Sequence, residues 1–525
     1  MKLDRAARNA AVLSLVCFGF GLMQLPAQEV QSGPSVRYDS RHDVSAPLRE
    51  MVWQALPRQR PDSEMPEPGH NWVLDQGIPG VDPVVQDAYL PTIHTKTVLN
   101  FDAVREDQNN AQVPDTNGAV GSTQFVEITN FDYAVYDKTT GKAILNPTNT
   151  NTLFVGFGNR CENTNPGDPV VVFDKLANRW LVSYFNYVSA YALCIAVSTT
   201  PDATGKYNRY EYDYNGSLPD YPKYAVWPDA YYGTTNIGGG AAQPCAYDRT
   251  AMLAGKKAAA ICFNPNASSL LPSDLDGSAT PPKGAPNHYL QLGSTTELQE
   301  FDFHVDFAHP KKSTFTGPHN IKVPSFSFAC GGFGNCIPQP PPGEQVEGLG
   351  DRLMFRLAYR NFGDHESMVV AHNVNPGGSS KAVSAMRWYE VRATPPGKPF
   401  TMYQAGTFQN QSTSLWMGST AMDKQGDIAL GMSASSAALD PSVWVTGRIP
   451  SDPLGKMEAP TVAVKGSAVE IGDTQRWGDY SSMSIDPTDD CTFWYSQMYY
   501  NQKHGGKSSG DWDTRIVAFK FDTCK

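Results

Sequence analysis

The chain has 525 residues, of which 18% are charged and 11% are aromatic, and it contains 45 glycines and 40 prolines. Its formal net charge of −11 argues against a nucleic-acid partner, because phosphate binding needs clustered Lys and Arg. Helical periodicity is nearly absent outside the short stretch from Asp248 to Lys257, and abundant turn residues are typical of many short strands. The composition therefore predicts an all-β protein.

The first 27 residues have the features of a secretory signal peptide. A basic start is followed by an apolar run from Ala10 to Leu25 and then by Pro26 and Ala27. This pattern predicts cleavage near Ala27 and a secreted or periplasmic protein. No later apolar run approaches the roughly 20 residues that a membrane-spanning helix needs, so no transmembrane segment is expected.

Residues 28–93 are rich in Pro, Gln, Arg and Asp, and they show little apolar alternation. They are expected to form an extended arm or linker. Residues 94–525 are expected to form one domain. Its first clean strand, Thr95 to Val104, precedes any complete repeat, so it is expected to pair with the end of the chain.

The domain contains a loose internal repeat. The clearest unit runs from Asp168 to Tyr214 as four β-rich runs separated by short polar turns, and similar patterns return at residues 123–144, 352–408, 418–449 and 479–521. Four antiparallel strands joined by hairpins make one propeller blade, and a repeated blade predicts a β-propeller. In such a ring the orphan N-terminal strand would complete the last blade.

The spacing of the turns that open each unit predicts the number of blades. Asp220 and Asp351 are 131 residues apart, whereas the other intervals are between 52 and 67 residues. Because residues 297–323 read as a third and a fourth strand, residues 238–296 are interpreted as an insertion within one blade. The sequence thus predicts six blades, with seven as the alternative.

The chain has nine cysteines. Cys17 belongs to the apolar part of the signal peptide, with a lipid anchor there as the alternative. The other eight, in an exported protein, predict four disulfides. Pairing of sequence neighbours is favoured because it keeps each bridge within one repeat or one loop: Cys161 with Cys194, Cys245 with Cys262, Cys330 with Cys336, and Cys491 with Cys524.

Polar residues near the starts of the repeats are expected to meet on one face, together with the long loops 238–296, 329–348 and 501–511. Carboxylates there suit acid/base chemistry, Arg and Lys suit anionic groups, and Trp can stack on a sugar ring. For any single Asp, a turn-forming role is the alternative. The candidate catalytic residues are Asp115, Asp168, Asp220, Glu347, Asp351 and Asp479. The candidate ligand-binding residues are Asn117, Lys223, Arg352, Trp416, Arg476 and Trp477.

Ser484 and the DPTDDCTFW stretch at 486–494 resemble the Asp-box hairpin of sialidase-like propellers, without the usual Gly after the Asp. The resemblance implies a propeller and no activity, since that hairpin lies away from the catalytic face in the family. The chain also looks like exported bacterial propeller proteins that end in a RWGDYSSM…DDCTFWY…FKF segment, a likeness to which no reaction is attached.

Two functions remain open at this stage. One is a glycan-active enzyme of glycoside hydrolase type that uses two of the carboxylates. The other is a propeller that binds a polysaccharide or a protein without turnover; a purely structural envelope protein is a third reading. No cofactor is required, a structural calcium ion is compatible with the acidic residues, and a monomer is expected. His288, His304 and His309 show no metal-ligand spacing.

Overall fold

The computed structural model describes residues 33–51, 80–106, 111, 113–164, 167–186, 190–238, 240–377, 382–471, 475–502 and 511–525. The predicted signal peptide lies outside the described residues. Within these ranges no helix is both long enough and apolar enough to span a membrane.

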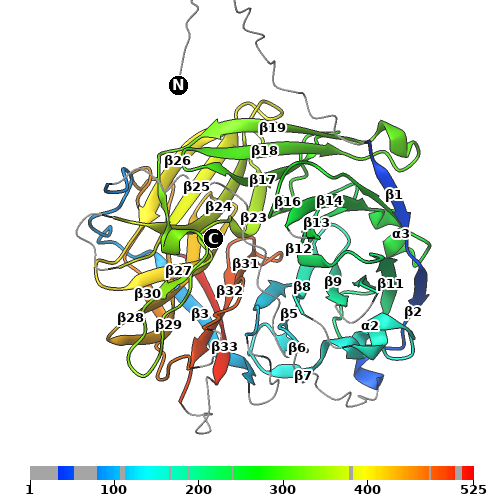
Figure 1. The fold of residues 1–525 in the computed structure, drawn as a ribbon, viewed down its shortest axis with the longest axis horizontal. Coiled ribbons are helices and arrows are strands. Elements are labelled where there is room, and N and C mark those ends of the chain that lie inside the picture. Colours follow the sequence, from blue (N-terminus) through cyan, green and yellow to red (C-terminus); the bar gives the residue numbers. More distant parts are fainter. Residues whose placement is uncertain are drawn as a thin grey trace, which may run out of the picture.

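Seven antiparallel sheets of four strands account for most of the strand residues, and they lie around a common centre (Figure 1). Sheet 1 consists of β4 (Asn117–Val120), β5 (Gln124–Ile128), β6 (Asp132–Asp137) and β7 (Ala143–Asn149). Sheet 2 consists of β8 (Val170–Asp174), β9 (Arg179–Asn186), β10 (Ala192–Ser198) and β11 (Tyr207–Asp213). Sheet 3 consists of β12 (Pro219–Val226), β13 (Tyr231–Ile237), β14 (Ala241–Tyr247) and β15 (Ala259–Cys262). Sheet 4 consists of β16 (Leu271–Leu275), β17 (Asn287–Ser294), β18 (Glu297–His304) and β19 (Thr314–Lys322). Sheet 5 consists of β23 (Met354–Asn361), β24 (Glu366–Asn375), β25 (Ala385–Ala393) and β26 (Thr401–Phe408). Sheet 6 consists of β27 (Ser414–Met422), β28 (Ile428–Ser436), β29 (Leu439–Arg448) and β30 (Thr461–Val464).

Sheet 7 joins the two ends of the domain. It consists of β31 (Ser482–Ile485), β32 (Phe493–Tyr500), β33 (Trp512–Phe521) and β3 (Thr95–Arg105). Thr95 lies opposite Phe521, so the orphan N-terminal strand pairs with the C-terminal strand as the sequence predicted. The first strands of successive sheets contact one another around the whole circle, from β4 through β8, β12, β16, β23, β27 and β31 back to β4. This arrangement is that of a β-propeller.

The structure has seven such sheets, the number that the sequence left as the alternative, and not six with an insertion at residues 238–296. Residues 238–296 contain β14, β15, β16 and β17, so they complete sheet 3 and begin sheet 4. The stretch 297–323 does supply the third and fourth strands of a sheet, namely β18 and β19. The missed first strand, β16, also pairs in parallel with β23 and so joins sheets 4 and 5.

One backbone feature recurs near the first strand of every sheet. A residue with positive φ lies there in all seven: Asp115 (45°), Asp168 (52°), Tyr221 (53°), Ser269 (47°), Leu349 (37°), Met417 (51°) and Gly478 (110°). The left-handed region suits Gly and is tolerated by Asp. Sheet 4 uses Ser269 in this place, and no Asp or Gly lies next to Ser269 to mark the turn, which explains why the sequence repeat missed it.

The described parts of the arm run along the outer edge of the sheets. β1 (Ser35–Tyr38) pairs with β15, and β2 (Arg41–Val44) pairs with β11, so each adds a fifth strand (Figure 1). Further along the arm, Asp82 forms a fully buried ion pair with Arg387, with 2.6 Å between Oδ2 and a guanidinium nitrogen. These contacts hold the arm against sheets 2, 3 and 5.

Short helices and small strand pairs occupy the connections. They are η1 (Leu48–Glu50), η2 (Thr150–Phe154), α2 (Arg160–Asn163), α3 (Arg249–Leu253), η3 (Pro310–Lys312), η4 (Ala329–Gly331), β20 (Ser327–Phe328), β21 (Asn335–Ile337) and β22 (Val346–Glu347). α3 lies in the stretch for which the sequence indicated a helix, and the Asp248 carboxylate caps it by accepting the Ala251 N–H at 2.9 Å.

The structure contains four disulfides, and they join the sequence-neighbour pairs. These are Cys161–Cys194, Cys245–Cys262, Cys330–Cys336 and Cys491–Cys524. Four bridges in one chain favour an oxidising compartment. The apolar core lies mainly between the faces of adjacent sheets, as where Val126 and Tyr133 of sheet 1 share a cluster with Val171 and Trp180 of sheet 2.

Candidate functional site

Three carboxylates from three different sheets meet where the first strands begin. Asp115 precedes β4, Asp168 precedes β8 and Asp479 precedes β31, and one oxygen of each lies within 4.8 Å of the others. We call these three residues, together with Arg476 and Lys223, the entrance cluster. The sequence predicted all five as site residues, and the structure brings them together.

Asp115 is the most deeply held carboxylate, with 1% of its surface exposed. Its Oδ1 accepts the Asp479 N–H at 2.7 Å, and its Oδ2 accepts a bond from the Asn130 amide at 2.7 Å. Burial raises its pKa, against the opposing charge of Arg476 and these hydrogen bonds. Asp115 therefore links sheet 7 to sheet 1 and retains its proton to a higher pH than an ordinary Asp.

Asp168 has the same linking role and is more accessible. Its Oδ2 accepts the Tyr221 N–H at 3.0 Å, which connects sheet 2 to sheet 3. Asp168 and Asp220 are both half-buried. They are the two predicted carboxylates that retain access to solvent.

Arg476 connects the carboxylates to the loop before sheet 5. One guanidinium nitrogen lies 2.5 Å from Asp479 Oδ1, and Nε lies 2.9 Å from Glu347 Oε1. The same Glu347 oxygen accepts the Trp477 N–H at 3.0 Å. Glu347 is buried, so it positions Arg476 and does not face a ligand.

Lys223 lies beneath the carboxylates and is fully buried. Its Nζ lies 3.4 Å from the centre of the Tyr221 ring and 4.0 Å from that of Tyr480, and it donates to the Pro222 carbonyl at 3.0 Å. The Arg352 guanidinium carbon also lies over the Tyr221 ring, 4.9 Å from its centre. Arg352 Nε pairs with Asp351 Oδ1 at 2.9 Å. These cations stabilise the centre of the ring through aromatic faces and neighbouring charges.

Several predicted ligand contacts are internal. Trp416 and Trp477 are fully buried and pack against each other with ring centres 5.0 Å apart, so neither offers a face to a sugar. Asn117 Oδ1 accepts the Val171 N–H at 3.0 Å as another link between sheets. Asp351 and Arg352 are buried as an ion pair. Their side chains fill the core or join neighbouring sheets, so the catalytic or binding role predicted for them stays a prediction.

Sequence reasoning missed the residues that hold the entrance cluster. Tyr221 and Tyr480 enclose Lys223, and Asn130 bonds both Asp115 and the Asp168 backbone N–H. Tyr221 and Tyr480 immediately follow Asp220 and Asp479 of the repeat, so that repeated Asp-Tyr pair was the available signal. Asn130 lies in the turn between β5 and β6, and no sequence pattern marked it as a site residue.

A second polar group lies at the opposite ends of the first strands. It lines a small cavity of about 20 Å³ among residues of β4, β8, β16, β23 and β31. Arg356 pairs with Asp274 at 2.9 Å and with Asp276 at 2.5 Å, and Lys175 lies 3.1 Å from Asp276. Although burial opposes it, the charges of Arg356 and Lys175 lower the pKa of Asp276. The described charges of this group pair with one another.

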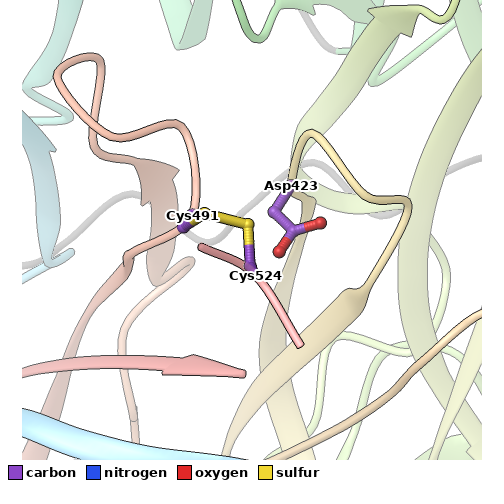
Figure 2. Close-up of side chains that lie close together, drawn as sticks. All are labelled: Asp423, Cys491 and Cys524. Carbon is purple, nitrogen blue, oxygen red and sulfur yellow. A yellow bond between two sulfur atoms is a disulfide. The ribbon is translucent and has the colours of Figure 1, made fainter. Parts of the chain in front are cut away.

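Asp423 lies beside the disulfide between Cys491 and Cys524 (Figure 2). Both sulfurs are bonded to each other, so the three residues do not offer thiolate ligands to a metal. Burial and the neighbouring charge of Asp427 raise the pKa of Asp423 to about 8. The group is a buried carboxyl pair at a hairpin between β27 and β28.

The comparisons with known proteins show distant structural likeness. No family model matches the chain, and no curated protein matches it significantly. The GH93 α-L-arabinofuranosidase of Fusarium graminearum in complex with arabinobiose has 10% identity and a TM-score of 0.33, over 80% of this chain and 98% of that one.

Two further solved structures are similar at the same level. The Penicillium chrysogenum α-L-arabinanase complexed with arabinobiose has 7% identity and a TM-score of 0.28, over 67% of this chain and 92% of that one. The WD40 domain of SCAP from fission yeast has 8% identity and a TM-score of 0.31, over 75% and 81%. The fold described above rests on strand pairing, and the function proposed below rests on the entrance cluster.

Proposed function

We propose that the protein is an exported glycan-active propeller whose ligand binds at the entrance cluster, and that it hydrolyses or otherwise processes that glycan. The observation that carries the proposal is the meeting of Asp115, Asp168 and Asp479 with oxygens within 4.8 Å, beside the half-buried Arg476. Carboxylates and a guanidinium around one point suit sugar hydroxyls and acid/base chemistry.

The carboxylates differ in the way that such chemistry needs. Burial raises the pKa of Asp115 against the charge of Arg476, whereas Asp479 lies 2.5 Å from the Arg476 guanidinium. Unequal neighbours of this kind can divide the roles of acid and base. Oxygens this close suit the retaining geometry, in which the carboxyl groups lie about 5–5.5 Å apart, better than the wider inverting geometry.

Asp168 is the carboxylate assigned to the reacting carbon. It is half-buried, whereas Asp115 and Asp479 are 1% and 3% exposed. In the proposed reaction the Asp168 carboxylate attacks the anomeric carbon while protonated Asp115 gives its proton to the leaving-group oxygen as the glycosidic bond breaks. Water then displaces the Asp168 ester and returns a proton to Asp115, and Arg476 orients the glycan. Asp220, also half-buried, contributes a further contact to sugar hydroxyls.

Glycan binding without turnover is the second candidate, and a specific observation favours it. Both oxygens of Asp115 and one oxygen of Asp168 already accept N–H bonds, and the bonds from Asp479 and Tyr221 join neighbouring sheets. Carboxylates with such a structural role need not carry out proton transfer. In that case Asp168, Asp220 and Arg476 would hold the glycan through hydrogen bonds alone.

A screen of the purified mature protein against a glycan library, scoring retention and cleavage separately, tests both candidates. The enzyme proposal predicts cleavage of a retained glycan and its loss in Asp168→Asn, with retention reduced less. The binding candidate predicts retention without products. Absence of both outcomes across the library would contradict the proposed function.

Structural calcium, which the sequence left open, would have to bind among the three carboxylates of the entrance cluster. Their all-oxygen chemistry suits calcium. Arg476 and the N–H donors to Asp115 and Asp168 already use oxygens there, so a calcium ion would have to compete with them. We therefore expect added calcium to leave the Tm unchanged, and a calcium-dependent rise in Tm would contradict this expectation.

A further inference from the structure

Four side chains with metal-binding chemistry meet on sheet 4, far from the entrance cluster in the sequence. His288 Nδ1 on β17 lies 2.9 Å from Glu300 Oε1 and 2.8 Å from Asp302 Oδ1, both on β18. His319 Nε2 on β19 lies 3.8 Å from Asp302 Oδ2. These four residues come from three neighbouring strands.

The strand register explains why they converge. His288 lies directly opposite Asp302, and His319 lies directly opposite Glu300. Glu300 and Asp302 are two residues apart on β18 and therefore point to the same face. Residues paired across antiparallel strands also share a face, so all four side chains project from the same side of the sheet.

One proton cannot satisfy the acceptors around His288. A ring nitrogen carries a single hydrogen, and the hydrogen bond from Nδ1 is made with Glu300. Asp302 Oδ1 is shielded from solvent and lies 2.8 Å from the same nitrogen, so it competes with Glu300 for that single hydrogen. A positive ion at the centre would serve both oxygens and the nitrogen together.

We propose that His288, Glu300, Asp302 and His319 form a binding site for a divalent transition metal ion, with zinc as the ion that fits the donors best. Two imidazoles and two carboxylates are typical zinc ligands, whereas calcium takes oxygen ligands. Zinc bonds of about 2.1 Å separate tetrahedral ligand atoms by roughly 3.4 Å, so the donors around His288 need to open by about half an ångström.

The surroundings fit such a site. The His288 ring packs against Phe400 with centres 4.8 Å apart and lies parallel to Tyr359 at 6.4 Å, which fixes its orientation. The Asp302 side chain is 27% exposed and that of His319 is 54% exposed, so an ion can reach the donors from solvent and His319 can turn toward it. The buried donors would hold the ion while the exposed ones admit it.

An ion pair is the competing explanation. Although burial lowers it, hydrogen bonds to Asp302 and Glu300 raise the pKa of His288 to about 9. In the absence of metal the protonated ring would therefore pair with the carboxylates. Metal binding and ion pairing predict different stoichiometries and spectra, so an experiment separates them.

The test uses the full mature chain, stripped with chelator and then titrated with zinc by calorimetry, with bound metal counted after gel filtration. We expect one zinc per chain, and the cobalt form should show the visible absorption of a four-coordinate site with nitrogen and oxygen ligands. Asp302→Asn and His319→Ala, both at accessible positions, should each weaken zinc binding by about 10-fold or more.

His309→Ala is the matched control. His309 Nδ1 also lies 3.3 Å from a carboxylate, that of Asp306, but on an exposed loop after β18 and without a second acceptor on the ring. This variant should bind zinc like the wild type. Failure of the wild-type protein to retain zinc, or equal zinc affinity in Asp302→Asn, would overturn the proposal and leave the ion pair. Neither result depends on the glycan screen.

Discussion

Replacement of Asp423 by Asn should stabilise the protein at high pH and change little at low pH. Asp423 is fully buried, and its Oδ1 accepts the N–H groups of Gln425 at 2.8 Å and Asp427 at 3.0 Å. Burial and the charge of Asp427 raise its pKa from 3.8 to about 8. Asn keeps the accepting oxygen and offers an N–H in place of the carboxyl proton.

The magnitude follows from the difference between the folded and unfolded pKa values. The folded state holds a proton between about pH 4 and pH 8 that the unfolded chain has released, so the free energy of unfolding falls as the pH rises through this window. About four pKa units at about 1.4 kcal/mol each set an upper limit of about 6 kcal/mol. Because Asp427 is also buried and shares the effect, we expect about 2–3 kcal/mol.

Thermal unfolding of wild type and Asp423→Asn at pH 5 and pH 9 measures this effect. In a domain of this size roughly 1–2 °C of Tm corresponds to 1 kcal/mol, so the variant should exceed the wild type by a few degrees at pH 9 and match it at pH 5. A Tm difference that is the same at both pH values would refute the reasoning.

Asp137→Asn is the matched control, since Asp137 also closes a hairpin but on the surface. Its Oδ1 accepts bonds from the Thr140 hydroxyl, the Thr140 N–H and the Thr139 N–H, and these lower its pKa. The stabilising effect of this ionised carboxylate is present above about pH 4 and lost below it. The control variant should therefore show the same small loss of Tm at pH 5 and pH 9.

Two further substitutions test the interior. Asp82→Ala leaves Arg387 buried and without its charge partner, so it should lower the free energy of unfolding by about 3–5 kcal/mol. Arg49→Ala removes an exposed pair with Asp202 and should change the free energy of unfolding by less than about 1 kcal/mol. Equal effects of the two substitutions in urea unfolding would contradict this account of the arm. Trp416→Ala should lower the free energy of unfolding by about 3–5 kcal/mol, because the indole ring is fully buried against Trp477. A loss of glycan retention with unchanged stability would show instead that Trp416 contacts a ligand.

The sequence predicted the fold where local patterns carried it. Sheet 2 was predicted strand by strand, because β8 to β11 are rich in β-forming residues and are joined by short polar turns. β3 was predicted as the strand that meets the chain end, and the disulfide pairs follow from the locality of the repeats. Sheet 4 was missed because Ser269 supplies the left-handed turn that Asp115 and Asp168 supply elsewhere.

The site was predicted in part for the same reason. The repeat brings Asp115, Asp168 and Asp479 together because all three precede first strands, and first strands lie around the centre. The repeat carries no information on burial, so it could not show that Trp416 and Trp477 pack inside the ring. The sequence also does not show which residues pair across strands, and His288 and Asp302 meet because they are opposite each other in β17 and β18.

The most direct test of the entrance cluster is the cleavage rate of Asp168→Asn on the glycan that the screen identifies, measured beside Asp137→Asn. Loss of an acid/base or nucleophilic group typically lowers the rate by a factor of about 100 or more. The proposed function predicts such a loss of rate in Asp168→Asn while the Tm of that variant stays unchanged. Asp137→Asn should cleave the glycan at the wild-type rate. Wild-type cleavage by Asp168→Asn would contradict it.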